Sequence, residues 1–181
     1  MKINIKPILF LILFVNINCV KQNEEQQVIN SKFDDASWHY GNDFPEDLAQ
    51  ENVSTHIGMY MKWCINNDLI SSELKEDSQV GIDSVKNNII TGAEFINSYS
   101  DGKFLSTDLS DIGRKFTNDY YEDNSDFSKN NGSYLDDYTK IFEKIIDKKS
   151  VYHVEDSEQN YLLIKAKIDS RFKEWKTFTS K

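Results

Sequence analysis

Residues 156–176 read DSEQNYLLIKAKIDSRFKEWK, which is the clearest helical pattern in the chain. Asp156 or Ser157 can cap this helix, because a short polar side chain accepts a hydrogen bond from a free backbone N–H of the first turn. Apolar residues then recur every three or four positions, as on one face of an amphipathic helix. The residues of this face are Tyr161, Ile164, Ile168, Phe172 and Trp175. The stretch therefore predicts a final helix of about four turns whose aromatic stripe packs into a core.

Helical periodicity also extends over much of the chain that precedes this final helix. The predicted helices run from Ser54 to about Asn67, Asp77 to about Ile90, Thr91 to Asp101, Ser106 to Glu122 and Ser133 to Ile146. Thr91 begins a Thr-Gly-Ala-Glu sequence, which is typical of a capping box at a helix start. Residues 123–132 are polar and are predicted to form a loop.

Extended structure is indicated only for short stretches. Residues 33–44 and 103–105 lack helical periodicity, and residues 150–154 are predicted to be a short strand or an extended link. The predicted fold class is therefore mainly α, with α+β as the alternative. It has about five helices around one core and at most a small two- or three-strand element.

Composition places the chain among globular proteins and argues against a nucleic-acid partner. The 181 residues are 39% hydrophobic and 28% charged, which is typical of one folded domain. There are 21 basic and 30 acidic residues, so the formal net charge is −9. Binding of nucleic-acid phosphates needs a basic patch, and the sequence contains none. We therefore expect no nucleic-acid partner.

The first 31 residues are predicted to form a targeting signal followed by a tether. Residues 1–6 carry two lysines and no acidic residue, and residues 8–15 are an unbroken apolar run that is too short to span a bilayer. Cys19 closes this segment, and a polar stretch follows it. The pattern resembles a bacterial lipoprotein signal, although Asn18 stands where Gly, Ala or Ser is usual. The resemblance implies that residues 1–18 are removed as a signal peptide and that Cys19 carries the lipid.

A lipid on Cys19 would place the protein in the cell envelope, anchored to a membrane. In a Gram-negative host this would be the outer membrane or the cell surface. Residues 19–31 would form a flexible tether, and residues 32–181 a single α-rich domain. The alternative is simple secretion without lipid. Cys64, the other cysteine, is expected to pack in the core as a small reduced side chain.

The chain has three histidines, and each lies at the boundary of a predicted element. We single out a candidate metal or acid–base site formed by His39, Asp43, His56, His153 and Glu155. Imidazole and carboxylate groups together suit zinc and similar ions. No local pair of the HExxH type is present, and the competing interpretation is a hydrogen-bonded structural histidine at each boundary. The sequence therefore predicts no cofactor unless the three histidines converge.

Adjacent carboxylates occur at residues 34–35, 136–137 and 155–156. Neighbours in sequence point apart on a helix or a strand, so such pairs do not form a two-carboxylate site. We expect these residues to belong to the solvated acidic surface.

Residues around the three histidines form a recognisable signature. They are Trp38, His39, Tyr40, Gly41, Asp43, Phe44 and Pro45, then Thr55, His56, Ile57, Gly58, Met59 and Trp63, and finally Tyr152, His153 and Glu155. Together they resemble a small, uncharacterised bacterial family over about residues 33–175. The resemblance implies no mechanism, because no activity is established for that family. Its members usually look like cytoplasmic domains, from which the signal peptide here departs.

These observations favour a non-enzymatic, membrane-tethered lipoprotein whose α-rich domain binds a protein partner. An immunity-type or envelope interaction protein would fit this description. The alternative is a metal-dependent enzyme that uses a three-histidine site.

Overall fold

The structure is a computed structural model that describes residues 31–41 and 44–180. The predicted signal peptide, Cys19 and most of the predicted tether lie outside the described residues, and so does Asp43. From Lys32 onward the chain forms one compact unit. In the part of the chain that is described, none of the helices combines the length and the apolar character needed to cross a membrane.

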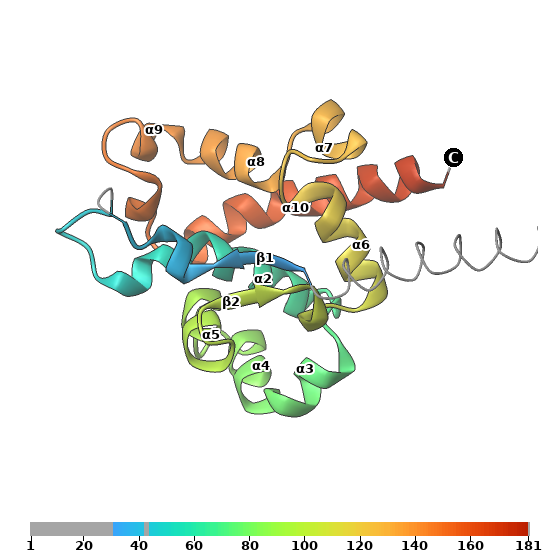
Figure 1. Cartoon of the computed structure of the whole chain (residues 1–181), viewed down its shortest axis with the longest axis horizontal. Helices are drawn as coiled ribbons and strands as arrows, with labels where there is room; N and C mark the ends of the chain where they lie inside the picture. Colours follow the sequence, from blue (N-terminus) through green and yellow to red (C-terminus); the bar gives the residue numbers. More distant parts are fainter. Residues whose placement is uncertain (1–30, 42–43, 181) are drawn as a thin grey trace, which may run out of the picture. The chain divides into compact units, whose positions relative to one another are not determined.

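Most of the described residues are helical (Figure 1). The α-helices are α2 (Thr55–Asn66), α3 (Ser72–Asp77), α4 (Gln79–Lys86), α5 (Gly92–Tyr99), α6 (Asp111–Tyr120), α7 (Asp126–Asn131), α8 (Tyr134–Ile141), α9 (Glu143–Ile146) and α10 (Glu158–Thr179). Short 3-10 helices cover η1 (Ala36–His39), η2 (Gln50–Ser54), η3 (Ser106–Asp108) and η4 (Val151–His153). Strands β1 (Lys32–Asp35) and β2 (Lys103–Leu105) pair as a two-stranded antiparallel sheet. The predicted mainly α fold with a small sheet is therefore confirmed.

Helix α2 forms the centre of the core. All of its residues from Thr55 to Ile65 are buried, and in Figure 1 the helix lies between α5 and α10. Helix α5 approaches α2 closely because both contribute glycines at the contact. A Cβ atom on Gly58 would lie only 2.1 Å from the backbone nitrogen of Ala93, and one on Gly92 would lie 1.9 Å from the carbonyl oxygen of Gly58.

Helix α10 confirms the predicted final helix and is longer than predicted, at 22 residues. Ser157 caps it by accepting a hydrogen bond from the backbone N–H of Asn160. Four residues of the predicted stripe are buried, and the remaining one, Phe172, is partly buried against the core. The stripe packs there because its rings remove a large apolar area from water.

Local elements differ from the prediction in several places, among them α3 and η1, which form where no helix was predicted. Helix α7 forms inside the predicted polar loop, because Ser125 caps it and Phe127 is buried beneath it. The helix predicted over residues 133–146 is interrupted at Phe142, which gives α8 and α9. Residues 151–153 form η4 in place of the predicted strand or link.

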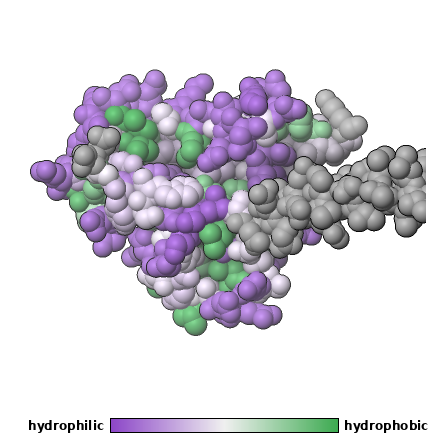
Figure 2. Space-filling model, viewed as in Figure 1, coloured by the Kyte–Doolittle hydropathy of each residue, from purple (hydrophilic) through white to green (hydrophobic). Residues whose placement is uncertain are grey.

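The acidic residues are not all on the surface. Figure 2 shows a mostly hydrophilic face on which hydrophobic residues form small separate patches. Asp34, Asp35 and Asp137, however, are buried, so the prediction that they belong to the solvated surface is wrong. Asp137 is compensated by Arg171, whose Nε lies 2.7 Å from Oδ2, and by the hydroxyl of Tyr120 at 3.0 Å.

Candidate functional site

Asp34, His39 and His56 meet at the point where β1, η1 and α2 come together. Nε2 of His39 lies 2.9 Å from Oδ1 of Asp34, and Nε2 of His56 lies 3.1 Å from Oδ2. The two imidazole rings are 4.9 Å apart, with an interplanar angle of 80°. One carboxylate therefore lies against the Nε2 atoms of two histidines.

The local sequence explains how His39 reaches Asp34. Asp35 caps η1 by accepting a hydrogen bond from the backbone N–H of Ser37 at 2.8 Å. The tight turn that follows brings His39 back to a residue five positions earlier. The register of β1 is irregular between Lys32 and Asp34, as at a β-bulge, which can redirect a side chain. Successive residues of β1 are consequently buried, which strict alternation along a strand would not allow.

The carboxylate of Asp34 is saturated with hydrogen-bond donors. The backbone N–H of Asp35 donates to Oδ1 at 2.8 Å, and the hydroxyl of Tyr121 donates to Oδ2 at 2.9 Å. With the two imidazoles, this makes one donor for each of the carboxylate's four lone-pair positions. Burial by itself raises the pKa of Asp34, but the hydrogen bonds from His39 and His56 and their electrostatic interaction with the carboxylate outweigh it and hold the pKa well below its ordinary value. Asp34 is therefore a buried anion.

Tyrosines fix the two histidines from outside. Nδ1 of His39 lies 3.2 Å from the hydroxyl of Tyr152. The hydroxyl of Tyr134 donates to the backbone carbonyl of His56 at 2.6 Å, which secures the first turn of α2. The side chain of His56 is buried, whereas that of His39 is 24% exposed. Solvent therefore reaches the site from the His39 side.

The chemistry of these side chains is that of a metal-ligand set. Two imidazole nitrogens and one carboxylate oxygen lie within 4.8 Å of one another. Among residues 31–41 and 44–180, no other group of three or more His, Cys, Asp or Glu residues meets this condition. Two histidines with one carboxylate bind divalent transition metals in many proteins.

The structure brings together only part of the predicted site. His39 and His56 lie together, but His153 is bonded elsewhere, to Ser150 at 2.8 Å and to Asp47 at 3.3 Å. Glu155 is exposed and does not belong to the ligand group. The third member of the group is Asp34, which the sequence prediction had assigned to the surface.

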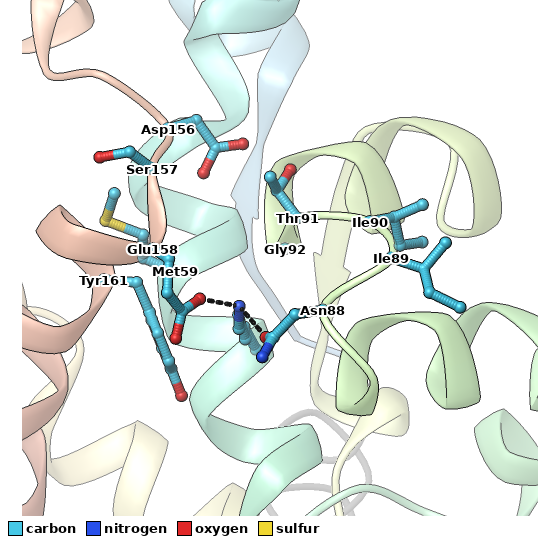
Figure 3. Close-up of a pocket in the computed structure, with 11 residues that line it drawn as sticks. Met59, Asn88, Ile89, Ile90, Thr91, Gly92, Asp156, Ser157, Glu158 and Tyr161 are labelled. Atoms are coloured by element: carbon cyan, nitrogen blue, oxygen red, sulfur yellow. Dashed lines mark hydrogen bonds and ion pairs between the residues drawn. The ribbon is translucent and has the colours of Figure 1, made fainter.

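Two further features lie apart from this ligand group. Cys64 is buried and free, as predicted, and burial raises the pKa of its thiol. A separate cavity of about 120 Å³ lies between Asn88, Glu158 and Tyr161 (Figure 3), and Lys62 also lines it. The ammonium group of Lys62 is held by two of its neighbours. Glu158 neutralises this ammonium at 2.5 Å and Asn88 accepts from it at 2.8 Å. The lysine is therefore already paired.

Comparison with family models gives a match to a domain family. A family model described as a domain of unknown function, DUF7832, matches residues 32–154. The match includes Asp34, His39, His56, Tyr121 and Tyr152, and ends before α10. No curated protein and no solved structure matches the chain significantly. The chain thus belongs to the DUF7832 family of domains of unknown function.

Proposed function

We propose that the protein is a lipid-anchored, metal-binding domain of the bacterial cell envelope. The observation that supports metal binding is the convergence of Asp34, His39 and His56 from three different elements. Such a set needs only the loss of the imidazole N–H hydrogens at Nε2 to become a ligand set, because a metal ion takes the place of these hydrogens.

The two Nε2–Oδ distances of 2.9 and 3.1 Å would suit neighbouring positions around a six-coordinate ion. Nitrogen and oxygen ligands about 3 Å apart, each about 2.1 Å from a metal, subtend an angle of about 90°. This angle is close to that of two neighbouring octahedral positions and narrower than the tetrahedral angle. Iron(II), manganese(II) or zinc(II) in a six-coordinate state would fit, with open positions for water. Those open positions make metal-dependent catalysis the second candidate function.

The surrounding residues would orient the ligands. When Nε2 of His39 binds the ion, the ring hydrogen lies on Nδ1, where the Tyr152 hydroxyl can accept it at 3.2 Å. Such an outer hydrogen bond fixes the ring and strengthens its donor nitrogen. Tyr121 and the backbone of Asp35 would hold the carboxylate in the same way.

The lipid anchor rests on the N-terminal sequence. Cys19 closes the apolar run of residues 8–15, and the residues after it are polar. A single acyl chain binds a membrane weakly, whereas several chains on one residue hold it firmly. The domain would therefore stay at the membrane through Cys19.

Metal analysis of the full-length protein in non-ionic detergent tests the proposal. The protein is stripped with a chelator, reloaded with Fe²⁺, Mn²⁺ or Zn²⁺, and its metal content is measured by inductively coupled plasma mass spectrometry. We expect one ion per chain for the wild type, and none for the His39→Ala/His56→Ala variant. His153→Ala is the matched control and should keep the ion.

A folding control keeps this test decisive. Asp34→Asn removes the ligand charge while keeping the shape of the side chain, and circular dichroism reports whether each variant is helical. A helical double variant that still binds one ion would overturn the proposal, and so would a wild type that binds none.

A further inference from the structure

A polar groove lies between η1, η2, α5 and the turn that leads into β2. Its larger hollow has a volume of about 560 Å³ and is bordered by Asp35, Tyr40 and Lys103. A second hollow of about 220 Å³ continues along α5. Glu51 and Asn97 line both, so the two hollows are neighbours. The combined size lies within the range of ligand-binding clefts.

We propose that this groove binds a basic segment of a protein partner, a role that goes beyond metal binding. The lining of the groove is mainly acidic, which suits such a basic segment. Five carboxylates and one lysine line the two hollows. The carboxylates are Asp35, Glu51, Glu94, Asp101 and Asp156. A cationic side chain in the groove would therefore be attracted.

Some of these charges are already paired, and Glu51 is not. Lys32 forms an ion pair with Asp35, and Lys103 pairs with Asp101 at 2.5 Å. The side chain of Glu51 is exposed and has no hydrogen bond or ion pair with any described residue. It lies where the two hollows meet, so the free negative charge is at the middle of the groove.

An exposed aromatic residue lines the larger hollow beside these carboxylates and gives a second reason to expect a cationic partner. This residue is Tyr40, which is 48% exposed. Two positions earlier in the chain, the Trp38 ring already accepts a cation, because the Lys32 ammonium lies 5.3 Å from its centre. The guanidinium group of Arg is found over aromatic rings more often than the ammonium group of Lys. Trp and Tyr are also enriched among the residues that contribute most of the binding free energy at protein interfaces.

The overall charge favours a protein partner that carries several basic residues. Removal of residues 1–18 would take away two of the 21 basic residues and none of the 30 acidic ones, leaving a net charge of −11. A charge of this size accelerates association with a basic partner. Within the described residues, the groove carboxylates do not form a metal-type cluster. An arginine-containing segment therefore suits the groove better than a lone metal ion.

Fluorescence anisotropy with a defined probe tests this inference. The probe is a fluorescein-labelled nine-residue peptide of alternating Arg and Gly, mixed with the full-length protein in non-ionic detergent at 150 mM salt. A peptide with Glu in place of Arg is the charge control. We expect the Arg peptide to bind, and the Glu peptide not to bind.

Variants locate the binding. Glu51→Lys and Tyr40→Ala should each weaken binding about fivefold to tenfold, since each removes an attraction of roughly 1 kcal/mol. Glu76→Lys, in α3, and Phe178→Ala, at the end of α10, are matched controls outside the groove and should change binding less than twofold. Each variant is checked by circular dichroism.

Three results would overturn the inference. One is equal weakening by Glu51→Lys and Glu76→Lys, which would indicate non-specific attraction to an acidic protein. Another is no binding of the Arg peptide. The last is binding of a neutral chitin oligosaccharide in place of the Arg peptide, which would assign Tyr40 to a glycan. All three are independent of metal content, so they separate this inference from the proposed metal site.

Discussion

The hydroxyl of Tyr121 donates a hydrogen bond to Oδ2 of Asp34 across 2.9 Å, although 87 positions separate the two residues in the chain. Tyr121 directly follows α6, and Asp34 lies in β1. Both residues are buried. The contact therefore ties distant parts of the domain to the carboxylate that two histidines share, and the stability of the fold depends on the same residue as the candidate site.

Loss of this hydrogen bond should lower the stability of the fold. Tyr121→Phe leaves a buried carboxylate with one donor fewer, and we expect the free energy of unfolding to fall by about 1–3 kcal/mol. Tyr138→Phe is the matched control, because the Tyr138 hydroxyl is buried without a hydrogen-bond partner among the described residues. Its removal should be neutral or slightly stabilising. Urea unfolding at pH 7 measures both, and equal losses would contradict the prediction.

Tyr152 should control metal affinity without being a ligand. Tyr152→Phe removes the hydroxyl that lies 3.2 Å from Nδ1 of His39, and loss of such an outer contact weakens metal binding about 10-fold to 100-fold. Competition with a chromophoric chelator measures the affinity. Tyr161→Phe is the control, since the Tyr161 hydroxyl accepts from Asn66 and does not contact the ligand set. Unchanged affinity in Tyr152→Phe would refute this positioning role.

The helices were predictable where an apolar face repeats over several turns. Helix α10 and the capping box of α5 follow from spacing and local hydrogen bonding alone. Helices α3 and α7 have only six residues each, too few for a period to be visible. Their stability comes from caps and from single buried side chains, Leu74 and Phe127, which depend on the rest of the fold.

The candidate site was only half predictable. His39 and His56 were identifiable because each lies at an element boundary, but nothing local indicates that Asp34 turns inward. Its burial follows from the irregular register of β1 against β2, a strand some 70 residues away. The Phe-Asp-Asp sequence directly before the aromatic loop was the one available signal, because an acidic residue beside a buried Phe needs compensation. His153 has the same local character as His39, yet its contacts are with Ser150 and Asp47.

The contact between α2 and α5 should not tolerate a side chain at Gly58. In Gly58→Ala the new methyl group would meet backbone atoms of Gly92 and Ala93 at 2.1–2.5 Å, and backbone cannot rotate away as a side chain can. We expect a loss of about 3 kcal/mol or more in the free energy of unfolding. Gly41→Ala is the control, because nothing lies within 4 Å of a Cβ atom there. A Gly58→Ala protein as stable as Gly41→Ala would show that the helices are not packed this closely.

Asp108 should make stability depend on pH between about 4 and 7. Burial raises its pKa to about 6, although its hydrogen bond with the backbone N–H of Leu105 opposes the shift. The folded state therefore holds the proton more tightly than the unfolded state, whose pKa is about 3.9. The resulting stabilisation is complete below about pH 4 and is lost as the pH rises through about 6.

Asp108→Asn tests this because asparagine stays neutral and keeps an oxygen that can accept from Leu105. Relative to the wild type, the variant should gain about 1–2 kcal/mol between pH 4 and pH 7, measured by urea unfolding. Asp77→Asn, at an exposed position of α3, should show no such change with pH. Parallel pH profiles for the wild type and Asp108→Asn would contradict the expected burial cost.

Attachment to the membrane should depend on Cys19 and not on Cys64. Cys19→Ser removes the thiol that would carry the lipid, and the polar residues that follow offer little apolar area to bind a bilayer. The acidic domain would also be repelled by anionic headgroups, so no second attachment should replace the lipid. We expect Cys19→Ser to move from the membrane fraction to the soluble fraction and to lose the mass of the lipid. Cys64→Ala should stay in the membrane fraction, because Cys64 is buried in α2. Unchanged processing and membrane retention of Cys19→Ser would mean that residues 1–18 do not act as a lipoprotein signal.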